Sequence, residues 1–268
     1  MATCYRHPNR ETGVSCSNCG RPICPDCMTP TPVGMRCPEC AGERTQVRTA
    51  QSIVRGGDPT ATYVLIALNV LAFVGSLAGG GAVASRGGGS VIDHGALYGP
   101  AVADGEYWRL VTSGFLHSGL IHIGFNMYLL YILGTMLEPS IGRVRFLALY
   151  FTALLGGSLG ALLMNPNSLT VGASGAVFGL MAGAVVIMRA RGFDPMASGI
   201  PMLIGLNLLF TFLFPGISIG GHIGGLVAGA VAAFVLVYVG DRVRSAAVPV
   251  AICVAMAAAL AVAAVMVA

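Results

Sequence analysis

The stretch Ser168–Gly183 reads SLTVGASGAVFGLMAG, and the rest of the sequence is best interpreted outward from it. Gly175, Gly179 and Gly183 recur every four residues, so a helix would carry them on one face. Faces of small residues at this spacing bring helix backbones close together inside a membrane. Ser174 precedes the first of these glycines and is either another small packing residue or a nucleophile. The choice depends on what the remainder of the chain places beside it.

The composition is that of a membrane protein. Of the 268 residues only 10% are charged and the mean hydropathy is +0.78, whereas a soluble chain needs more charge to cover its surface. Several apolar runs approach the roughly 20 residues that cross a bilayer. The runs are continuous and not alternating, which favours helices over a barrel. We therefore expect an all-α, multi-pass membrane protein.

Apolar runs divide the chain into a polar module at 1–42, a linker at 43–59, a six-span core at 60–240 and a seventh span at 241–268. The residues between the first two spans, 80–119, are too polar to cross a membrane and too many for a plain turn. We expect an interfacial loop with short helices there. The seven predicted spans are 63–78, 120–137, 144–163, 174–188, 198–214, 220–239 and 247–268.

Arginine placement predicts the orientation of the chain. The N-terminal segment is rich in arginine, and the loops after the third and fifth spans contain none. Because basic residues are retained in the cytoplasm, we expect a plasma-membrane protein with its N-terminus in the cytoplasm and its C-terminus outside. The arginines of the loops after the second, fourth and sixth spans are Arg143, Arg145, Arg189, Arg191, Arg242 and Arg244.

Seven of the eight cysteines lie in the first 40 residues, where they and one histidine form four pairs with two-residue gaps. Such a gap lets both side chains of a pair reach one tetrahedral ion. A reducing cytosol disfavours disulfides, and metal would supply the folding energy of a module with so small an apolar core. We expect two structural Zn²⁺ ions and no cofactor for catalysis. The pairs are Cys4 and His7, Cys16 and Cys19, Cys24 and Cys27, and Cys37 and Cys40.

The spacing of the four pairs resembles that of cross-braced B-box zinc fingers. The resemblance implies that the first and third pairs share one ion and that the second and fourth share the other. Sequential pairing is the alternative. No coordination position is evidently left open, so a catalytic zinc is not expected. The module could bind a protein partner, regulate the core or promote oligomerisation, and no nucleic-acid partner is expected.

Polar side chains inside the predicted spans point to function, because their burial in lipid is costly. His122 and Asn126 lie four residues apart at the start of the second span, Ser174 opens the fourth, and His222 lies near the start of the sixth. These spans all run inward, so the four residues share a depth near the outer leaflet. The fourth span has about 15 apolar residues, or about 22 Å, against a hydrocarbon core of roughly 30 Å. We expect Ser174 at the floor of a water-filled depression.

The sixth span has a glycine face like that of the fourth, formed by Gly221, Gly225 and Gly229. Docking of the two faces would bring Ser174 and His222 together, because each lies beside the first glycine of its face. A serine hydroxyl becomes a good nucleophile when a base takes its proton, and a neutral histidine is such a base.

The same region could stabilise a negatively charged intermediate. The Ser174 N–H lies at a helix N-terminus, where the dipole favours negative charge. Asn126 and His122 could add donors to form an oxyanion hole. The acids Glu138 and Asp241 fall at the inner ends of their spans, too far in depth to orient His222. We therefore expect a Ser–His dyad and not a triad.

Five motifs over residues 60–240 resemble those of the rhomboid intramembrane serine proteases and occur in the order that the family has. The serine motif alone would carry little weight, so the resemblance rests on all five. They are Gly172-Ala173-Ser174-Gly175, Gly221-His222 with Gly225, His117 with His122 and Asn126, Trp108-Arg109, and Glu138.

The resemblance implies a six-helix core in which Ser174 is the nucleophile and His222 the base. It also implies that Asn126, His122 and the Ser174 N–H form the oxyanion site. Phe178 stands where some members have a tyrosine that stacks on the histidine, so the ring is kept and the hydroxyl is lost. The seventh span and the zinc module are additions to the minimal core.

Other residues of these motifs are expected to support the fold. Trp108 and Arg109 would structure the first loop at the membrane surface. Glu138 would act as a cap or bond a loop, and His117 would be structural.

The implied function is cleavage of other membrane proteins within or beside their transmembrane segments, with those proteins and the lipid bilayer as partners. A substrate segment would enter laterally, unwind locally and offer a carbonyl to Ser174, with small side chains at the cleaved bond. One alternative is a catalytically silent relative that binds membrane clients, against which the intact Ser174 and His222 argue. Another is a transporter or channel, which would show an inverted repeat that this sequence lacks.

Overall fold

The computed structural model describes residues 2–31, 34–42, 57–80, 89–243 and 245–268. The chain forms two compact units, Met1–Ile53 and Val54–Ala268, which are described separately. Most of the predicted linker and most of the glycine-rich stretch after the first span lie outside the described residues.

Within its described residues, the N-terminal unit has two pairs of short antiparallel strands and two short helical turns. In its described part, the buried hydrophobic side chains are Ile23 and six cysteines. A core of this size is too small to stabilise a fold by apolar burial. The elements are β1 (Ala2–Thr3), β2 (Glu11–Thr12), the 3-10 turn η1 (Pro25–Cys27), β3 (Thr29–Thr31), β4 (Gly34–Arg36) and α1 (Pro38–Gly42).

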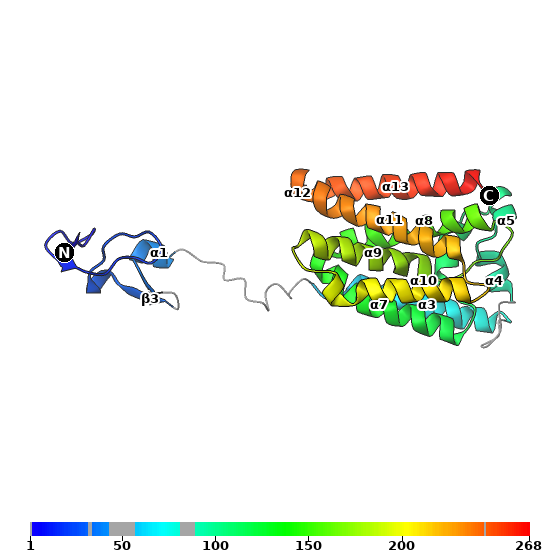
Figure 1. Ribbon diagram of the computed structural model, residues 1–268, viewed down its shortest axis with the longest axis horizontal. Helices are drawn as coiled ribbons and strands as arrows, with labels where there is room; N and C mark the ends of the chain where they lie inside the picture. Colours follow the sequence, from blue (N-terminus) through cyan, green and yellow to red (C-terminus); the bar gives the residue numbers. More distant parts are fainter. Residues whose placement is uncertain (1, 32–33, 43–56, 81–88, 244) are drawn as a thin grey trace. The chain divides into compact units, whose positions relative to one another are not determined.

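In the part of the second unit that the structure describes, seven apolar helices form a bundle, and the predicted all-α membrane fold is confirmed (Figure 1). Five of them are long enough to cross a membrane when α11 is counted with its continuation to Val243, and α9 and α10 are shorter. The predicted bounds differ from the observed ones by at most four residues, except that the sixth predicted span ends five residues beyond α11. The helices are α3 (Thr60–Ala78), α7 (Leu120–Ile141), α8 (Arg143–Met164), α9 (Ser174–Ala190), α10 (Ile200–Leu213), α11 (Ile219–Phe234) and α13 (Ala247–Met266).

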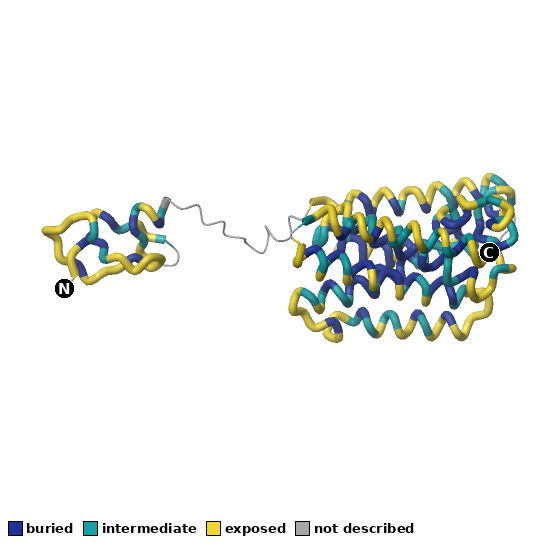
Figure 2. The backbone as a smooth tube through the Cα atoms, turned by 90° about the horizontal axis from the view of Figure 1, so that it is seen from above, coloured by how far each residue is buried: buried dark blue, intermediate teal, exposed yellow. Residues whose placement is uncertain are grey.

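The ends of the bundle are less regular. α11 continues through a π-helical segment, Val235–Val239, into the short α12 (Gly240–Val243). α13 packs against α8 and against this π-helical segment, at one side of the bundle in Figure 1. Figure 2 shows that buried positions gather in the middle of the bundle.

Short helices occupy the described residues 89–119 that precede α7, as predicted. Arg109 is buried there, donates to the Ala96 carbonyl at 2.7 Å and pairs with Glu106. Leu97 bridges to Thr170, which joins this segment to the chain that leads into α9. The buried Arg109 side chain thus joins two parts of this loop, through Ala96 and Glu106. The elements are α4 (Ser90–Gly95), α5 (Gly99–Ala103), α6 (Arg109–Thr112) and the 3-10 turn η2 (Ser113–Phe115).

Glycines let several helices approach each other closely. A methyl group added at Gly225 would overlap the backbone of Gly175, and one at Gly229 would overlap Gly179. Because these numbers rise together, α9 and α11 run parallel, with their glycine faces in contact as predicted. α8 also approaches α11 closely, because Gly160 of α8 faces Gly220 of α11.

Glu138 holds the first turn of α3, which confirms the prediction that it acts as a cap. Its carboxylate accepts the N–H groups of Ala61 at 2.9 Å and Thr62 at 2.8 Å. These N–H groups have no partner within their own helix, and the positive end of the helix dipole favours a carboxylate there. The contact ties α7 to α3.

Candidate active site and metal centre

Ser174 is the first residue of α9, and the chain reaches it through a glycine turn. Gly172 has a φ of 130°, a conformation that side chains other than glycine rarely adopt. Its N–H donates to the Ser113 carbonyl at 2.9 Å, which fixes the turn against η2. The Ser174 side chain is half-buried. Its backbone N–H is among those that a helix start leaves without a partner in the helix.

His222 lies in the first turn of α11, which Ser218 caps. The Ser218 hydroxyl accepts the Gly221 N–H at 3.1 Å, and its carbonyl accepts the His222 N–H at 3.1 Å. The His222 Nε2 atom is 2.8 Å from Ser174 Oγ. This contact joins the two helices that the glycine faces hold together, and it places a base at the serine hydroxyl.

Phe178 covers one face of the His222 ring. The ring centroids are 4.2 Å apart and the planes are 23° from parallel. Phe178 lies one helical turn after Ser174 on α9, so it extends the contact between α9 and α11. Stacking of this kind limits rotation of the imidazole.

His122 reaches the turn that precedes Ser174. A Cβ added at Gly172 would lie 2.7 Å from His122 Nε2 and 3.6 Å from Ser174 Oγ, so both groups flank the same point. The Ser118 N–H lies 3.4 Å from His122 Nδ1, and the Ser118 hydroxyl lies 3.0 Å from it. Because a backbone N–H can only donate, the neutral His122 ring carries its proton on Nε2. This N–H is available to an oxyanion beside Ser174.

Asn126 is buried one turn further along α7. Its Nδ2 donates to the His122 carbonyl at 2.9 Å, which engages one of the two N–H bonds of the amide. Ser174, His222 and His122 thus meet at one place, and Asn126 adjoins them through the backbone of His122.

Sequence analysis missed one polar group of the site. Thr211 of α10 is buried and places Oγ1 2.7 Å from His222 Nδ1. The same hydroxyl donates to the Asn207 carbonyl at 2.7 Å. The sequence was searched only for an acid that could orient His222, and not for a hydroxyl. A threonine in an apolar helix gives no signal of its own, although its helix is joined to that of His222 by a short loop.

His117 lies behind His122, with the ring centroids 5.0 Å apart. It is 2% exposed, and neither ring nitrogen has a hydrogen-bond partner among the described residues. Burial and then the neighbouring His122 lower the pKa of His117 to about 3. The ring is therefore neutral at physiological pH and supports His122 by packing.

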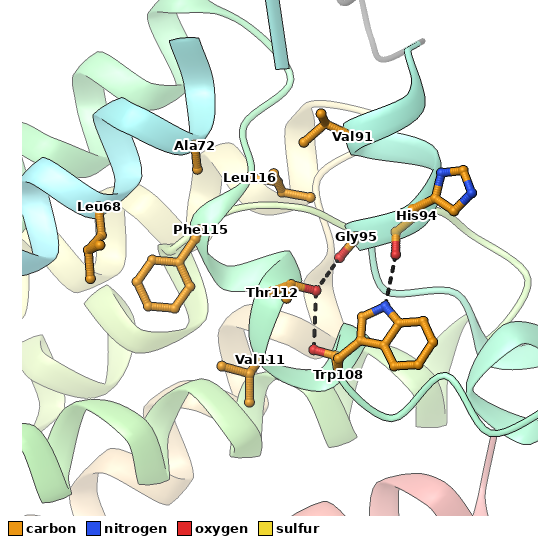
Figure 3. Close-up of a pocket in the computed structure, with 10 residues that line it drawn as sticks. All are labelled: Leu68, Ala72, Val91, His94, Gly95, Trp108, Val111, Thr112, Phe115 and Leu116. Atoms are coloured by element: carbon orange, nitrogen blue, oxygen red, sulfur yellow. Dashed lines mark hydrogen bonds between the residues drawn. The ribbon is translucent and has the colours of Figure 1, made fainter. Parts of the chain in front are cut away.

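An apolar cavity of about 610 Å³ lies between α3 and the short helices of the first loop (Figure 3). Trp108 borders it and donates from its indole to the His94 carbonyl at 3.1 Å. Thr112 donates to the Gly95 carbonyl at 2.7 Å. These bonds give Trp108 a structuring role in the loop. None of the candidate catalytic residues lines this cavity.

The N-terminal unit gathers its eight predicted ligands into two groups of four. The first pair joins the third and the second pair joins the fourth, so the grouping is interleaved and not sequential. Within each group the candidate ligand atoms all lie within 4.8 Å of one another. The groups are Cys4, His7, Cys24 and Cys27, and Cys16, Cys19, Cys37 and Cys40.

Distances between the side chains fit tetrahedral coordination. The Sγ atoms of Cys4 and Cys27 are 3.9 Å apart and those of Cys19 and Cys37 are 3.8 Å apart. Sulfurs about 2.3 Å from a tetrahedral Zn²⁺ would be about 3.8 Å apart. His7 Nδ1 lies 3.4 Å from the Cys27 sulfur, so this nitrogen would be the ligand.

Backbone donors favour the thiolate of Cys16. The Cys37 N–H donates to the Cys16 sulfur at 3.3 Å. The N–H groups of Cys19 and Cys37 lower the pKa of the Cys16 thiol to about 6. The thiolate is the form that binds metal, so the surroundings of the Cys16 sulfur suit a metal ligand.

The fold and the paired serine and histidine define a multi-pass membrane protein with a potential nucleophile inside its bundle. The family model of the Rhomboid domain matches residues 104–239, which is about half of the chain. The match contains every candidate catalytic residue of the helical unit. The chain belongs to the rhomboid family.

Known relatives are named as proteases. Rhomboid protease GluP of Bacillus subtilis (strain 168) is 33% identical over 182 residues, which cover 67% of this chain and 35% of the relative. Rhomboid-like protease 1 of Toxoplasma gondii is 36% identical over 135 residues, 48% of this chain and 46% of the relative. Putative rhomboid protease YdcA of Bacillus subtilis (strain 168) is 40% identical over 84 residues, 31% of this chain and 42% of the relative. The matches therefore span less than half the length of each relative.

Proposed function

We propose that this protein is an intramembrane serine endopeptidase that cleaves transmembrane proteins with a Ser174–His222 dyad. The observation that carries the proposal is the 2.8 Å contact between Ser174 Oγ and His222 Nε2. The contact is formed by two apolar helices, where a polar pair is costly unless it serves a function. Membership of the rhomboid family and the names of the relatives support the same activity.

The reaction begins when Ser174 Oγ attacks the peptide carbonyl carbon and its proton passes to His222 Nε2. The Ser174 N–H, the His122 Nε2–H and the Asn126 amide stabilise the resulting oxyanion. The C–N bond then breaks, and the departing amine takes the proton from His222. In the second half, water gives a proton to His222 and attacks the acyl ester, and the Ser174 oxygen leaves with that proton.

The substrate carbonyl must be free of its helix before it can react, because a carbonyl inside a helix is already hydrogen-bonded. The proposed substrate is therefore a transmembrane segment that unwinds locally. The turn at Gly172 is crowded by His122, so small side chains suit the cleaved bond. α9 has 17 residues, or about 26 Å, which is shorter than the roughly 30 Å hydrocarbon core of a bilayer. Ser174, at the end of this helix, therefore lies below the membrane surface and is reached by water from one side.

Cleavage of a single-span protein in proteoliposomes tests the dyad. Wild type, Ser174→Ala and His222→Ala are compared as purified full-length chains. We expect each variant to lose at least about 10³-fold in kcat, because the two groups act as a unit. Circular dichroism checks that both variants remain helical. Cleavage that persists in both would refute the dyad.

A fluorophosphonate probe gives a second measurement. It should label wild type and leave Ser174→Ala unlabelled. This separates an enzyme from a silent membrane protein that only binds clients, since the latter would bind single-span segments without labelling.

We further propose that the chain lies in the plasma membrane with its N-terminus in the cytoplasm and its C-terminus outside, as arginine placement indicates. Protease added to intact cells should remove a tag placed after Ala268 and spare a tag placed before Met1. The reverse pattern would contradict this orientation.

We also propose that the N-terminal unit binds two structural Zn²⁺ ions, one in each group of four ligands. The tetrahedral distances and the near absence of an apolar core in the described part of this unit support the proposal. Four protein ligands fill each site, so the metal stabilises the unit and supplies no step of the cleavage reaction. Elemental analysis should find about two zinc per chain.

A further inference from the structure

We propose that Thr211 is a positioning residue for the catalytic base. Its hydroxyl selects the tautomer and the orientation of His222 in which Nε2 can take the proton of Ser174. The inference rests on the proposed peptidase function and adds a neutral hydroxyl, from a third helix, to the dyad.

The directions of the hydrogen bonds carry the argument. The Thr211 hydroxyl has one proton, and it donates to the Asn207 carbonyl at 2.7 Å. Its oxygen therefore accepts in the 2.7 Å contact with His222 Nδ1, which requires a proton on Nδ1. A neutral imidazole with this proton has its lone pair on Nε2. That atom is 2.8 Å from Ser174 Oγ, so the ring is ready to act as a base.

The opposite tautomer would be unproductive. If Thr211 donated to Nδ1, the proton of the neutral His222 ring would lie on Nε2 and point at Ser174. The ring would then have no lone pair for the serine proton. The Asn207 carbonyl prevents this because it already accepts the Thr211 proton. Threonine in a helix often makes such a bond to the carbonyl four residues earlier.

Burial makes this contact specific. α10 buries only three of its 14 residues, Ile200, Asn207 and Thr211, and two of them form this arrangement. Thr211 is 2% exposed and His222 is 8% exposed, so water competes little for Nδ1. Most of the few buried positions of this largely exposed helix are thus used to orient His222.

The expected effect lies in the rate of the chemical step. Loss of the carboxylate that orients histidine in a serine protease triad lowers kcat by about 10⁴-fold, and a neutral hydroxyl stabilises the imidazolium less, so we expect about 10- to 100-fold here. KM should change little, because Thr211 acts through His222.

The experiment compares Thr211→Val, which removes the hydroxyl, with Thr211→Ser, which keeps it. Thr135→Val is the matched control, since the Thr135 hydroxyl also bonds the carbonyl four residues earlier, that of Tyr131 at 2.7 Å, on α7. kcat and KM are measured on a single-span substrate with full-length protein in proteoliposomes. The rate of fluorophosphonate labelling gives a readout that is independent of substrate binding.

We expect Thr211→Val to lower kcat and the labelling rate by about 10- to 100-fold, with Thr211→Ser and Thr135→Val close to wild type. Equal rates for Thr211→Val and wild type, or equal losses in the valine and serine variants, would overturn the inference.

A measurement on the unsubstituted protein covers the case in which Thr211→Val does not fold. ¹⁵N NMR of the histidine rings, assigned by the loss of signals in His222→Ala, should show a proton on Nδ1 and none on Nε2 of His222. The reverse tautomer would overturn the inference. Cleavage that does not need Ser174 is a different outcome, because it refutes the proposed function itself.

Discussion

His117 lies in the loop that leads into α7, and burial leaves both of its ring nitrogens without a partner among the described residues. Burial, and then the adjacent His122, lower its pKa to about 3, whereas an unfolded chain has a histidine pKa of about 6.5. Between these values the unfolded state binds a proton that the folded state does not. The contribution of His117 to the free energy of unfolding is therefore fully present above pH 6.5 and is lost progressively as the pH drops toward 3.

This linkage predicts a pH-dependent stability that can be assigned to one side chain. Between pH 7 and pH 5, His117 should account for a loss of about 2 kcal/mol of unfolding free energy. His117→Phe keeps a ring without a titrating nitrogen and should reduce the loss by that amount. Thermal unfolding in detergent at the two pH values measures it, with the exposed His94→Phe as the control. The same pH dependence in all three proteins would contradict this role of His117.

The sequence reveals residues of the site only where their own chemistry is unusual for their surroundings. A serine, a histidine and an asparagine at the starts of apolar spans are such cases, so Ser174, His222 and Asn126 could be proposed from the sequence alone. Thr211 is different, because threonine is common in membrane helices and bonds its own backbone. Its role depends on which helix lies against His222, and that is a property of the fold.

At the scale of elements, the site depends on how closely α9 and α11 approach each other. Gly225 of α11 faces the backbone of Gly175, which is the residue after Ser174. A methyl group at Gly225 must push the two backbones apart, since no flexible side chain is present to move away. The Ser174–His222 contact spans the same two helices and would lengthen with them.

Gly225→Ala is therefore expected to lower the free energy of unfolding by about 1–3 kcal/mol, as overpacking does, and to abolish cleavage. Gly124→Ala on α7 is the matched control, because nothing lies within 4 Å of the added Cβ. Thermal unfolding and cleavage of a single-span substrate are measured for both. Full activity of Gly225→Ala would show that the close approach of α9 and α11 does not hold Ser174 and His222 together.

Periodicity predicts that a helix packs closely but does not identify its partner. The glycine faces of α9 and α11 could be matched because each has a candidate catalytic residue, Ser174 or His222, beside its first glycine. α8 also packs against α11, with Gly160 facing Gly220, yet no chemical group on α8 indicated this. The short helices before α7 were likewise expected as a class, while their bounds depend on tertiary bonds such as that from Arg109 to Ala96.

At the scale of the whole molecule, the proposed chemistry is divided between the two units. The proposed catalytic groups all lie in Val54–Ala268, and the eight candidate zinc ligands all lie in Met1–Ile53. Composition alone predicted this division, because cysteine pairs and apolar runs do not overlap along the chain. Which cysteine pairs share an ion is a different question, since each pair is a local feature and the grouping is a long-range one.

Double substitutions distinguish the interleaved grouping from the sequential one. Cys4→Ser with Cys24→Ser removes two ligands from the same group, so the other group should still hold its ion and the full-length protein should contain about one zinc. Cys4→Ser with Cys16→Ser removes one ligand from each group, so both ions should be lost to a competing chelator. Sequential pairing gives the reverse zinc contents. Elemental analysis after dialysis against the chelator measures them, and equal zinc contents in the two double variants would contradict the interleaved grouping.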